Sequence, residues 1–127
     1  MIYVFPLLIP HSTPATAPQI TVCQLSAGTL IRMALQFPGG LIGLAHVGLN
    51  VGLHQLYPTN PEGSFASSSE TVEWEEEYEL SEPPYQLVAR AWNDDDTYDH
   101  TITVRVVIRE PAATKSLFEE IKSLFGG

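Results

Sequence analysis

The residues best suited to chemistry lie in one acidic loop near the C-terminal end of the chain. Between Trp92 and His100 the sequence reads WNDDDTYDH, which brings the carboxylates of Asp94, Asp96 and Asp99 close together along the chain. Ca²⁺ prefers several carboxylate and carbonyl oxygens, so this loop is a candidate calcium site. The loop lacks the central glycine and terminal glutamate of an EF-hand. Because Asn and Asp also hydrogen-bond to their own turn, we favour a solvated hairpin tip.

A second acidic segment, 70–82, is a candidate source of a pair of catalytic carboxylates, as glycosidases use. Alternate glutamates on one strand face lie about 7 Å apart, a distance that suits acid–base chemistry. However, a catalytic pair needs two different environments to separate its pKa values, and here each glutamate has glutamate neighbours. We therefore expect a solvated acidic strand whose repulsion discourages edge-to-edge pairing.

The remaining nucleophiles and metal ligands form no recognisable motif. Cys23 is the single cysteine, so we expect no internal disulfide and no thiolate metal cluster. The sequence contains neither a G-x-S-x-G elbow nor a Gly-rich phosphate loop. The four histidines fall on separate predicted elements: His11, His46, His54 and His100. We therefore expect no enzyme activity, no cofactor and no metal.

Most of the chain follows a two-residue hydrophobic period, which predicts strands with one buried face. The period is clearest in Thr29–Phe37, Thr71–Leu80 and Thr101–Arg109, with Glu76 out of phase, as at a bulge or an edge. The other predicted strands are Ile2–Ile9, Gln19–Leu25, Leu41–Leu49, Leu53–Tyr57 and Tyr85–Trp92. Seven or eight short strands separated by turns predict an all-β fold, an antiparallel β-sandwich or jelly roll. Residues 19–37 and 85–109 are expected to be hairpins.

We expect three parts along the chain. Residues 1–18 combine an apolar strand with the Pro-rich stretch PHSTPATAP, which predicts an extended N-terminal arm on a tether. Residues 19–110 form the predicted sandwich domain, and residues 111–127 a linker with a short amphipathic helix. In that helix Ser116 and Glu119 make a capping box, and Gly126 supplies the C-terminal stop. Ten residues are too few for a helix alone in water, so it must dock.

Charge is unevenly distributed along the 127 residues, whose net charge is −9. Residues 1–61 contain one charged side chain, Arg32, whereas residues 62–99 hold eight Glu and four Asp against Arg90. The acidic balance argues against nucleic acid and membrane surfaces as partners. No stretch approaches the ~20 apolar residues of a membrane span, and the N-terminus lacks the basic region of a signal peptide. The sequence leaves the localisation open.

A half-chain almost without charge is a poor surface to present to water, and it has the composition of a buried interface. We therefore expect a homo-oligomer, with a larger protein shell or a partner groove as a further possibility for the C-terminal helix. The residues expected at the interface are Ile2, Tyr3, Val4, Phe5, Leu7 and Leu8 of the arm and the helix stripe Leu117, Phe118, Ile121, Leu124 and Phe125.

Five short strings between residues 40 and 108 carry a resemblance to a known class of protein: His54–Pro58, Val72–Trp74, Tyr78–Pro84, Asn93–Asp95 and His100–Val104. The stretch resembles small all-β proteins of tailed-bacteriophage virions. The resemblance implies a decoration, cement or accessory role on a particle, without catalysis. Together with the composition, it gives our leading expectation, a non-enzymatic structural subunit of a symmetric assembly.

Two other functions remain open from the sequence. One is a β-sandwich module that binds carbohydrate or calcium through the 93–100 loop, although we expect most aromatic side chains to pack in the core. The other is an adaptor that docks a partner through its C-terminal helix.

Overall fold

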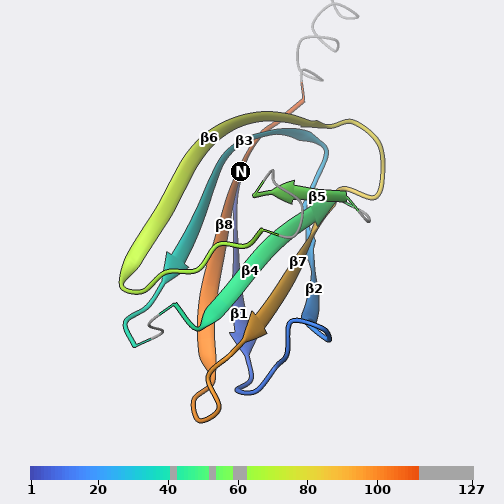
Figure 1. The fold of residues 1–127 in the computed structure, drawn as a ribbon. Helices are drawn as coiled ribbons and strands as arrows, with labels where there is room; N and C mark the ends of the chain where they lie inside the picture. The colour runs from blue at the N-terminus through green and yellow to red at the C-terminus, as the bar shows by residue number, and fades with distance from the viewer. Residues whose placement is uncertain (41–42, 52–53, 59–62, 112–127) are drawn as a thin grey trace, which may run out of the picture.

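The structure of the protein, a computed structural model, describes residues 1–40, 43–51, 54–58 and 63–111, which form two antiparallel four-stranded sheets (Figure 1). The strands are β1 (Ile2–Ile9), β2 (Gln19–Gln24), β3 (Gly28–Phe37), β4 (Ala45–Val51), β5 (His54–Tyr57), β6 (Glu70–Leu80), β7 (Gln86–Asn93) and β8 (His100–Arg109). One sheet has the order β1-β8-β3-β6 and the other β2-β7-β4-β5. The predicted all-β fold of antiparallel sheets is confirmed, and the predicted C-terminal helix lies outside the described residues.

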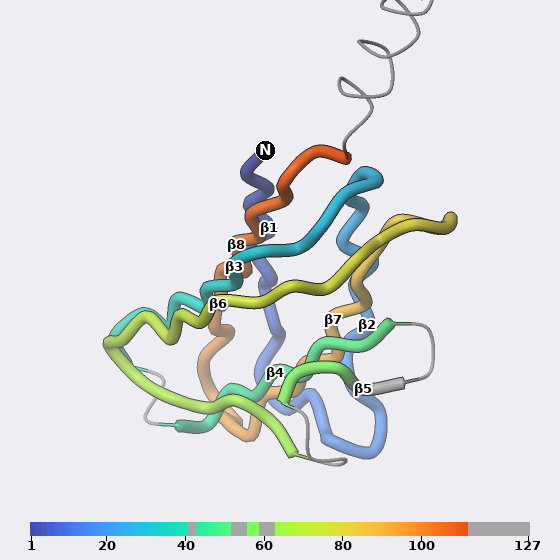
Figure 2. The backbone as a smooth tube through the Cα atoms, turned by 90° about the horizontal axis from the view of Figure 1, so that it is seen from above, coloured from blue at the N-terminus to red at the C-terminus, as the bar shows by residue number. Residues whose placement is uncertain are grey.

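The two-residue period of the strands explains how the sheets face each other (Figure 2). Along β8 the even-numbered apolar residues Ile102, Val104, Val106 and Ile108 point inward and are buried. Their neighbours on β3 and the facing residues of β4 and β7 do the same, so one continuous core fills the space between the sheets. Removing this apolar surface from water is the main force that holds the sheets together.

The chain passes from one sheet to the other at most of its turns. The expected hairpins over residues 19–37 and 85–109 are therefore wrong, because β2 pairs with β7 while β3 pairs with β6 and β8. A short turn between two alternating strands fits a hairpin within one sheet and a crossing between two facing sheets equally well. Local periodicity does not distinguish the two, since pairing depends on distant strands.

The N-terminal segment is part of the sandwich rather than a separate arm. β1 pairs with β8 of the same chain along its whole length, from Ile2 opposite Val107 to Ile9 opposite His100. Leu7 and Ile9 are buried in the core. The expected boundary after residue 18 is thus not a domain boundary in the structure, because the inward side chains of β1 complete the core.

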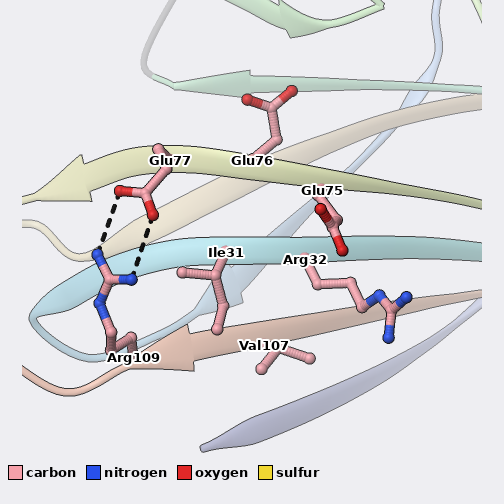
Figure 3. A pocket seen from close by; sticks show the side chains of 7 residues that line it. All are labelled: Ile31, Arg32, Glu75, Glu76, Glu77, Val107 and Arg109. Atoms are coloured by element: carbon pink, nitrogen blue, oxygen red, sulfur yellow. Dashed lines mark hydrogen bonds and ion pairs between the residues drawn. The ribbon is translucent and has the colours of Figure 1, made fainter.

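The bulge expected at Glu76 is confirmed. The register of β6 against β3 shifts between Leu30 and Arg32, so that β6 contains an extra residue at this point. Glu75 and Glu77 are exposed, whereas Glu76 is half-buried and its side chain leaves the opposite side of β6 (Figure 3). Exposure alternates without a break along β6, so Glu76 lies on the same face as Trp74, away from the acidic outer surface.

Gly28 begins β3 at a point where the backbone of β8 approaches closely. Its φ is +149°, and a Cβ there would lie 2.5 Å from the Arg109 carbonyl oxygen and 2.6 Å from Cγ2 of Ile108. We predict that Gly28→Ala lowers the free energy of unfolding by about 3 kcal/mol, through overpacking and backbone strain. Urea denaturation followed by tryptophan fluorescence measures the loss.

Gly40→Ala is the matched control, because Gly40 has a φ of +88° with nothing within 4 Å of the added Cβ. Its free energy of unfolding should fall by only about 1–2 kcal/mol, which is the cost of a left-handed backbone conformation for alanine. Equal losses in the two variants would contradict the steric explanation for Gly28.

Candidate functional site

β1 and β2 lie at the same side of the sandwich, one in each sheet, and neither strand contains a charged residue. The Gln19 side chain joins them by donating from Nε2 to the Leu8 carbonyl at 2.8 Å. Five aliphatic side chains on the outer sides of these strands are 53–71% exposed: Ile2, Val4, Leu8, Ile20 and Val22. We call these two strands with their five side chains the apolar edge. These side chains lie on the outer faces of the two sheets, on either side of the shared edge, and exposed apolar residues on charge-free strands indicate a contact surface.

The residues expected at an N-terminal interface divide between the two faces of β1. Ile2, Val4 and Leu8 are exposed, whereas Leu7 is buried in the core. Tyr3 and Phe5 are partly buried against the core, with their rings stacked at a centroid distance of 6.2 Å. The five expected helix residues, Leu117, Phe118, Ile121, Leu124 and Phe125, lie outside the described residues.

The backbone of β1 is only partly available to another strand. Met1 exchanges backbone hydrogen bonds of 2.8 Å with Ile108, so alternation directs the N–H and C=O groups of the even-numbered residues toward the free side. Among these, Pro6 has no N–H, and the Leu8 carbonyl already accepts from Gln19. The edge is therefore open for backbone pairing over the first half of β1, and contacts further along must come from side chains.

The opposite side of the sandwich is built differently. β6, an edge strand there, contains six glutamates, and five of them are exposed: Glu70, Glu73, Glu75, Glu77 and Glu79. β5, the edge strand of the other sheet, is only four residues long. Short strands and like charges both discourage pairing with another molecule. The expectation of a solvated acidic strand is confirmed for β6.

A surface hollow of about 640 Å³ lies on the outer face of the first sheet (Figure 3). Its lining residues are Ile31, Arg32, Glu75, Glu76, Glu77, Val107 and Arg109. The Arg109 guanidinium donates to both carboxylate oxygens of Glu77, at 3.2 and 3.1 Å. Both side chains are more than half exposed, so the pair contributes little to stability. Because its charges are mixed and partly paired with one another, the hollow shows no preference for an anion or a cation.

Three histidine–carboxylate pairs hold the 93–100 loop. Their nitrogen–oxygen distances are 2.7 Å for His11–Asp99, 3.1 Å for His46–Asp94 and 2.9 Å for His100–Asp95. The histidines come from the β1–β2 connection, from β4 and from β8, so the loop is tied to three separate parts of the fold. Sequence reasoning missed these pairs: the partners of the first are 88 positions apart, and only His100 and Asp95, five positions apart, are local in sequence.

The three carboxylates proposed as calcium ligands have separate partners. Asp94 and Asp99 face different histidines, and Asp96 accepts a hydrogen bond from the Thr97 hydroxyl at 2.8 Å. No group of three or more His, Cys, Asp or Glu side chains within the described ranges is placed to hold a metal ion. The structure does not bring Asp94, Asp96 and Asp99 together as a calcium site.

A serine, a histidine and an aspartate do meet on the outer face of the second sheet. His46 lies with Nδ1 3.0 Å from the Ser64 hydroxyl and Nε2 3.1 Å from Asp94. This resembles a catalytic relay with the two ring nitrogens exchanged. A hydrolase also needs donors for an oxyanion, but the nearby amides of Phe65 and Val47 donate to each other's carbonyls. The geometry therefore favours a structural link between β4 and the segment before β6.

Asp95 is the most constrained carboxylate of the loop. Hydrogen bonds from the Thr97 N–H and then from the His100 ring hold the pKa of Asp95 below its ordinary value of 3.8. The pKa of Asp99 is also lowered, first by the His11 N–H and then by the His11 ring. Both carboxylates therefore stabilise the loop in their ionised form.

A scan against protein-family models found no match, and searches of curated proteins and of solved structures found none either. Across the described part of the chain, no helix is long and apolar enough to cross a membrane. The function must therefore be argued from the residues and their geometry.

The lowered pKa of Asp95 predicts how stability depends on pH. A carboxyl group with a lowered pKa stabilises the folded state above its ordinary value of 3.8, and this contribution is lost as the pH falls through the lowered pKa. We predict that Asp95→Asn lowers the urea midpoint near neutral pH and makes the loss of stability below about pH 4 shallower than in the wild type. Urea titrations from about pH 7 to pH 2 measure both effects.

Asp96→Asn removes the same charge from the same loop, but Asp96 accepts only from the neighbouring Thr97 hydroxyl among the contacts described. It should leave the midpoint and its pH dependence close to wild type. If the two variants behaved alike, net charge rather than the hydrogen bonds of Asp95 would explain the pH dependence.

Proposed function

We propose that the protein is a non-enzymatic structural subunit of a symmetric homo-oligomer, and that its subunits meet through the apolar edge. The observation that carries this proposal is the contrast between the two sides of the sandwich. β6 is protected by exposed glutamates and β5 by its short length, whereas β1 and β2 have no charge and five exposed aliphatic side chains. Natural sandwiches protect the edges that must stay free, so an unprotected edge points to a contact.

The apolar edge alone supplies a modest driving force. Burying its five aliphatic side chains contributes on the order of 5–10 kcal/mol, because each is already partly covered. Association costs about 4–15 kcal/mol in lost freedom of motion, so the two terms are of similar size. Backbone pairing along the first half of β1 and further apolar contacts are therefore needed for a stable assembly.

The predicted C-terminal stripe is our candidate for those further contacts. β8 ends where β1 begins, since Ile108 donates its N–H to the Met1 carbonyl at 2.8 Å. Figure 2 shows the N-terminus beside the end of β8. Pro111, the last residue described, lines a hollow together with Gly28 and Leu80, three residues after this junction. We assign Leu117, Phe118, Ile121, Leu124 and Phe125 to the same interface, on the sequence pattern alone.

The strand order supports the more specific proposal of a virion surface protein. The orders β1-β8-β3-β6 and β2-β7-β4-β5 are those of a jelly roll, an architecture used by viral capsid and lectin domains. Fold analogy does not establish function, but it agrees with the resemblance of residues 40–108 to virion proteins. The alternative of a calcium-binding module is less favoured, because histidines occupy the carboxylates that would bind the ion.

Charge placed on the apolar edge should dissociate the assembly. We predict that the wild-type protein forms a multiple of its 14.0 kDa subunit at micromolar concentration. Val4→Lys and Val22→Lys should each shift it to the 14.0 kDa monomer, because a lysine is costly to bury in an apolar contact. Size-exclusion chromatography with light scattering measures the mass, and circular dichroism checks that the sheets remain.

Tyr98→Lys is the matched control, because Tyr98 is 67% exposed and lies in the 93–100 loop rather than on the apolar edge. It should keep the wild-type mass. A wild-type protein that stays monomeric would overturn the proposal, as would equal dissociation by all three lysine variants.

Deletion of residues 112–127 tests the contribution of the C-terminal stripe. We predict that the truncated chain still folds but associates at least about tenfold more weakly, since it loses five large apolar side chains from the contact. Sedimentation velocity over a concentration series measures the dissociation constant. An unchanged constant would remove the C-terminal segment from the interface and leave the apolar edge as the sole contact.

A further inference from the structure

A cleft of about 350 Å³ lies between β5, β6 and the segment that precedes β6, on the side of the sandwich away from the apolar edge. Six of the residues that line it are Tyr57, Phe65, Val72, Glu73, Trp74 and Glu76. It is shallow and open to solvent. None of these side chains takes part in the proposed subunit contact.

Three aromatic rings form one wall of the cleft. Trp74 stacks on Phe65 at a centroid distance of 5.1 Å and an interplanar angle of 22°. Tyr57 packs against Trp74 at 5.2 Å with its ring tilted by 60°. Trp74 and Phe65 are only partly buried, and their mutual stacking covers one face of each ring. Aromatic ring faces attract cations through the negative charge density of their π-systems.

Two carboxylates add negative charge to this wall. Glu73 is exposed, whereas Glu76 is half-buried because it follows Trp74 by two residues and so lies on the same face of β6. Figure 3 shows that Glu76 leaves β6 in the opposite direction from the Arg109-bound Glu77. Strand alternation therefore places an acidic side chain beside aromatic rings, at a position where an apolar residue would continue the pattern.

The Tyr57 hydroxyl lies beside Glu76 at this cleft. The residue is only 5% exposed, and among the described residues its hydroxyl makes no hydrogen bond of ordinary geometry. Burial, then the charge of nearby Glu76, and a looser hydrogen bond to the Glu76 carboxylate raise the pKa of the Tyr57 phenol above its ordinary value, so it stays protonated. A phenol that donates to Glu76 keeps its oxygen as an acceptor, so a ligand with N–H donors can bond to both groups.

We propose that this cleft binds a guanidinium group. A guanidinium is flat and weakly hydrated, so it lies well against the faces of Trp74 and Phe65. Its N–H groups are all donors, which suits the carboxylate of Glu76 and the hydroxyl oxygen of Tyr57. The carboxylates exclude an anion, and a quaternary ammonium ion would donate to neither acceptor.

The guanidinium group comes either from a free small molecule or from an arginine side chain in a peptide. Methylguanidinium represents the first source and N-acetyl-arginine methylamide the second. Binding is followed by the indole N–H resonance of Trp74 in two-dimensional NMR, with Trp92 as the internal reference. We expect a saturable shift of the Trp74 signal with both probes. Tighter binding of the arginine derivative would identify a peptide source, and equal or weaker binding a free one.

Glu76→Gln should weaken methylguanidinium binding at least about tenfold, because it removes the charge that the ligand meets. Glu75→Gln is the matched control: it removes the same charge from the adjacent residue, which is exposed on the other side of β6. This variant should bind within about twofold of wild type. Tyr57→Phe, which keeps the ring, should weaken binding about threefold or more. It serves as the second test if Glu76→Gln does not fold.

Tetramethylammonium has the same charge without N–H donors, and we expect it to bind at least about fivefold more weakly than methylguanidinium. Three results would overturn the proposal: a shift of Trp74 that does not saturate, equal weakening by Glu75→Gln and Glu76→Gln, or equal binding of the two cations. The first would show that no site exists, the second that only surface charge attracts the probe, and the third that the acceptors play no part.

Discussion

The structure depends on which residues form the edge strands of its open β-sandwich. Two four-stranded sheets leave four edges, β1 and β6 in one sheet and β2 and β5 in the other, and each has backbone groups that pair with no strand of the sandwich. Hydrophobic packing between the sheets involves only the inward side chains of these strands, so their outward side chains and free backbone groups decide which surface meets another molecule. Here one side carries the six glutamates of β6, whereas β1 and β2 on the other side contain no charged residue.

Strand alternation links this edge chemistry to the interior. Exposure alternates without a break from Thr71 to Glu79, so Glu76 lies on the inward face of β6 together with Trp74. Because β6 is an edge strand, Glu76 reaches the border between the core and the solvated face, beside Trp74 and close to the Tyr57 hydroxyl. An acidic residue at one inward position of an edge strand thus acquires an aromatic setting.

The sequence predicted what depends on neighbouring residues. The two-residue period located the strands and the antiparallel sandwich, and the out-of-phase Glu76 located the bulge. It failed where the structure depends on residues far apart in the chain. The strands expected to pair as hairpins belong to different sheets. The expected arm pairs with β8 instead, because only the folded chain brings Leu7 and Ile9 to the core. The histidine partners of the acidic loop were missed for the same reason, since spacing along the chain says nothing about His11 meeting Asp99.

The central claim is that copies of this chain meet through β1 and β2. Hydrogen–deuterium exchange, measured by mass spectrometry over a range of protein concentrations, tests it most directly, because it reports which backbone amides become protected on association. We predict that protection rises with concentration in Ile2–Ile9 and Gln19–Gln24 and stays constant in Glu70–Leu80. Protection that rises in Glu70–Leu80 instead, or that is independent of concentration in a protein that remains at 14.0 kDa, would contradict the account.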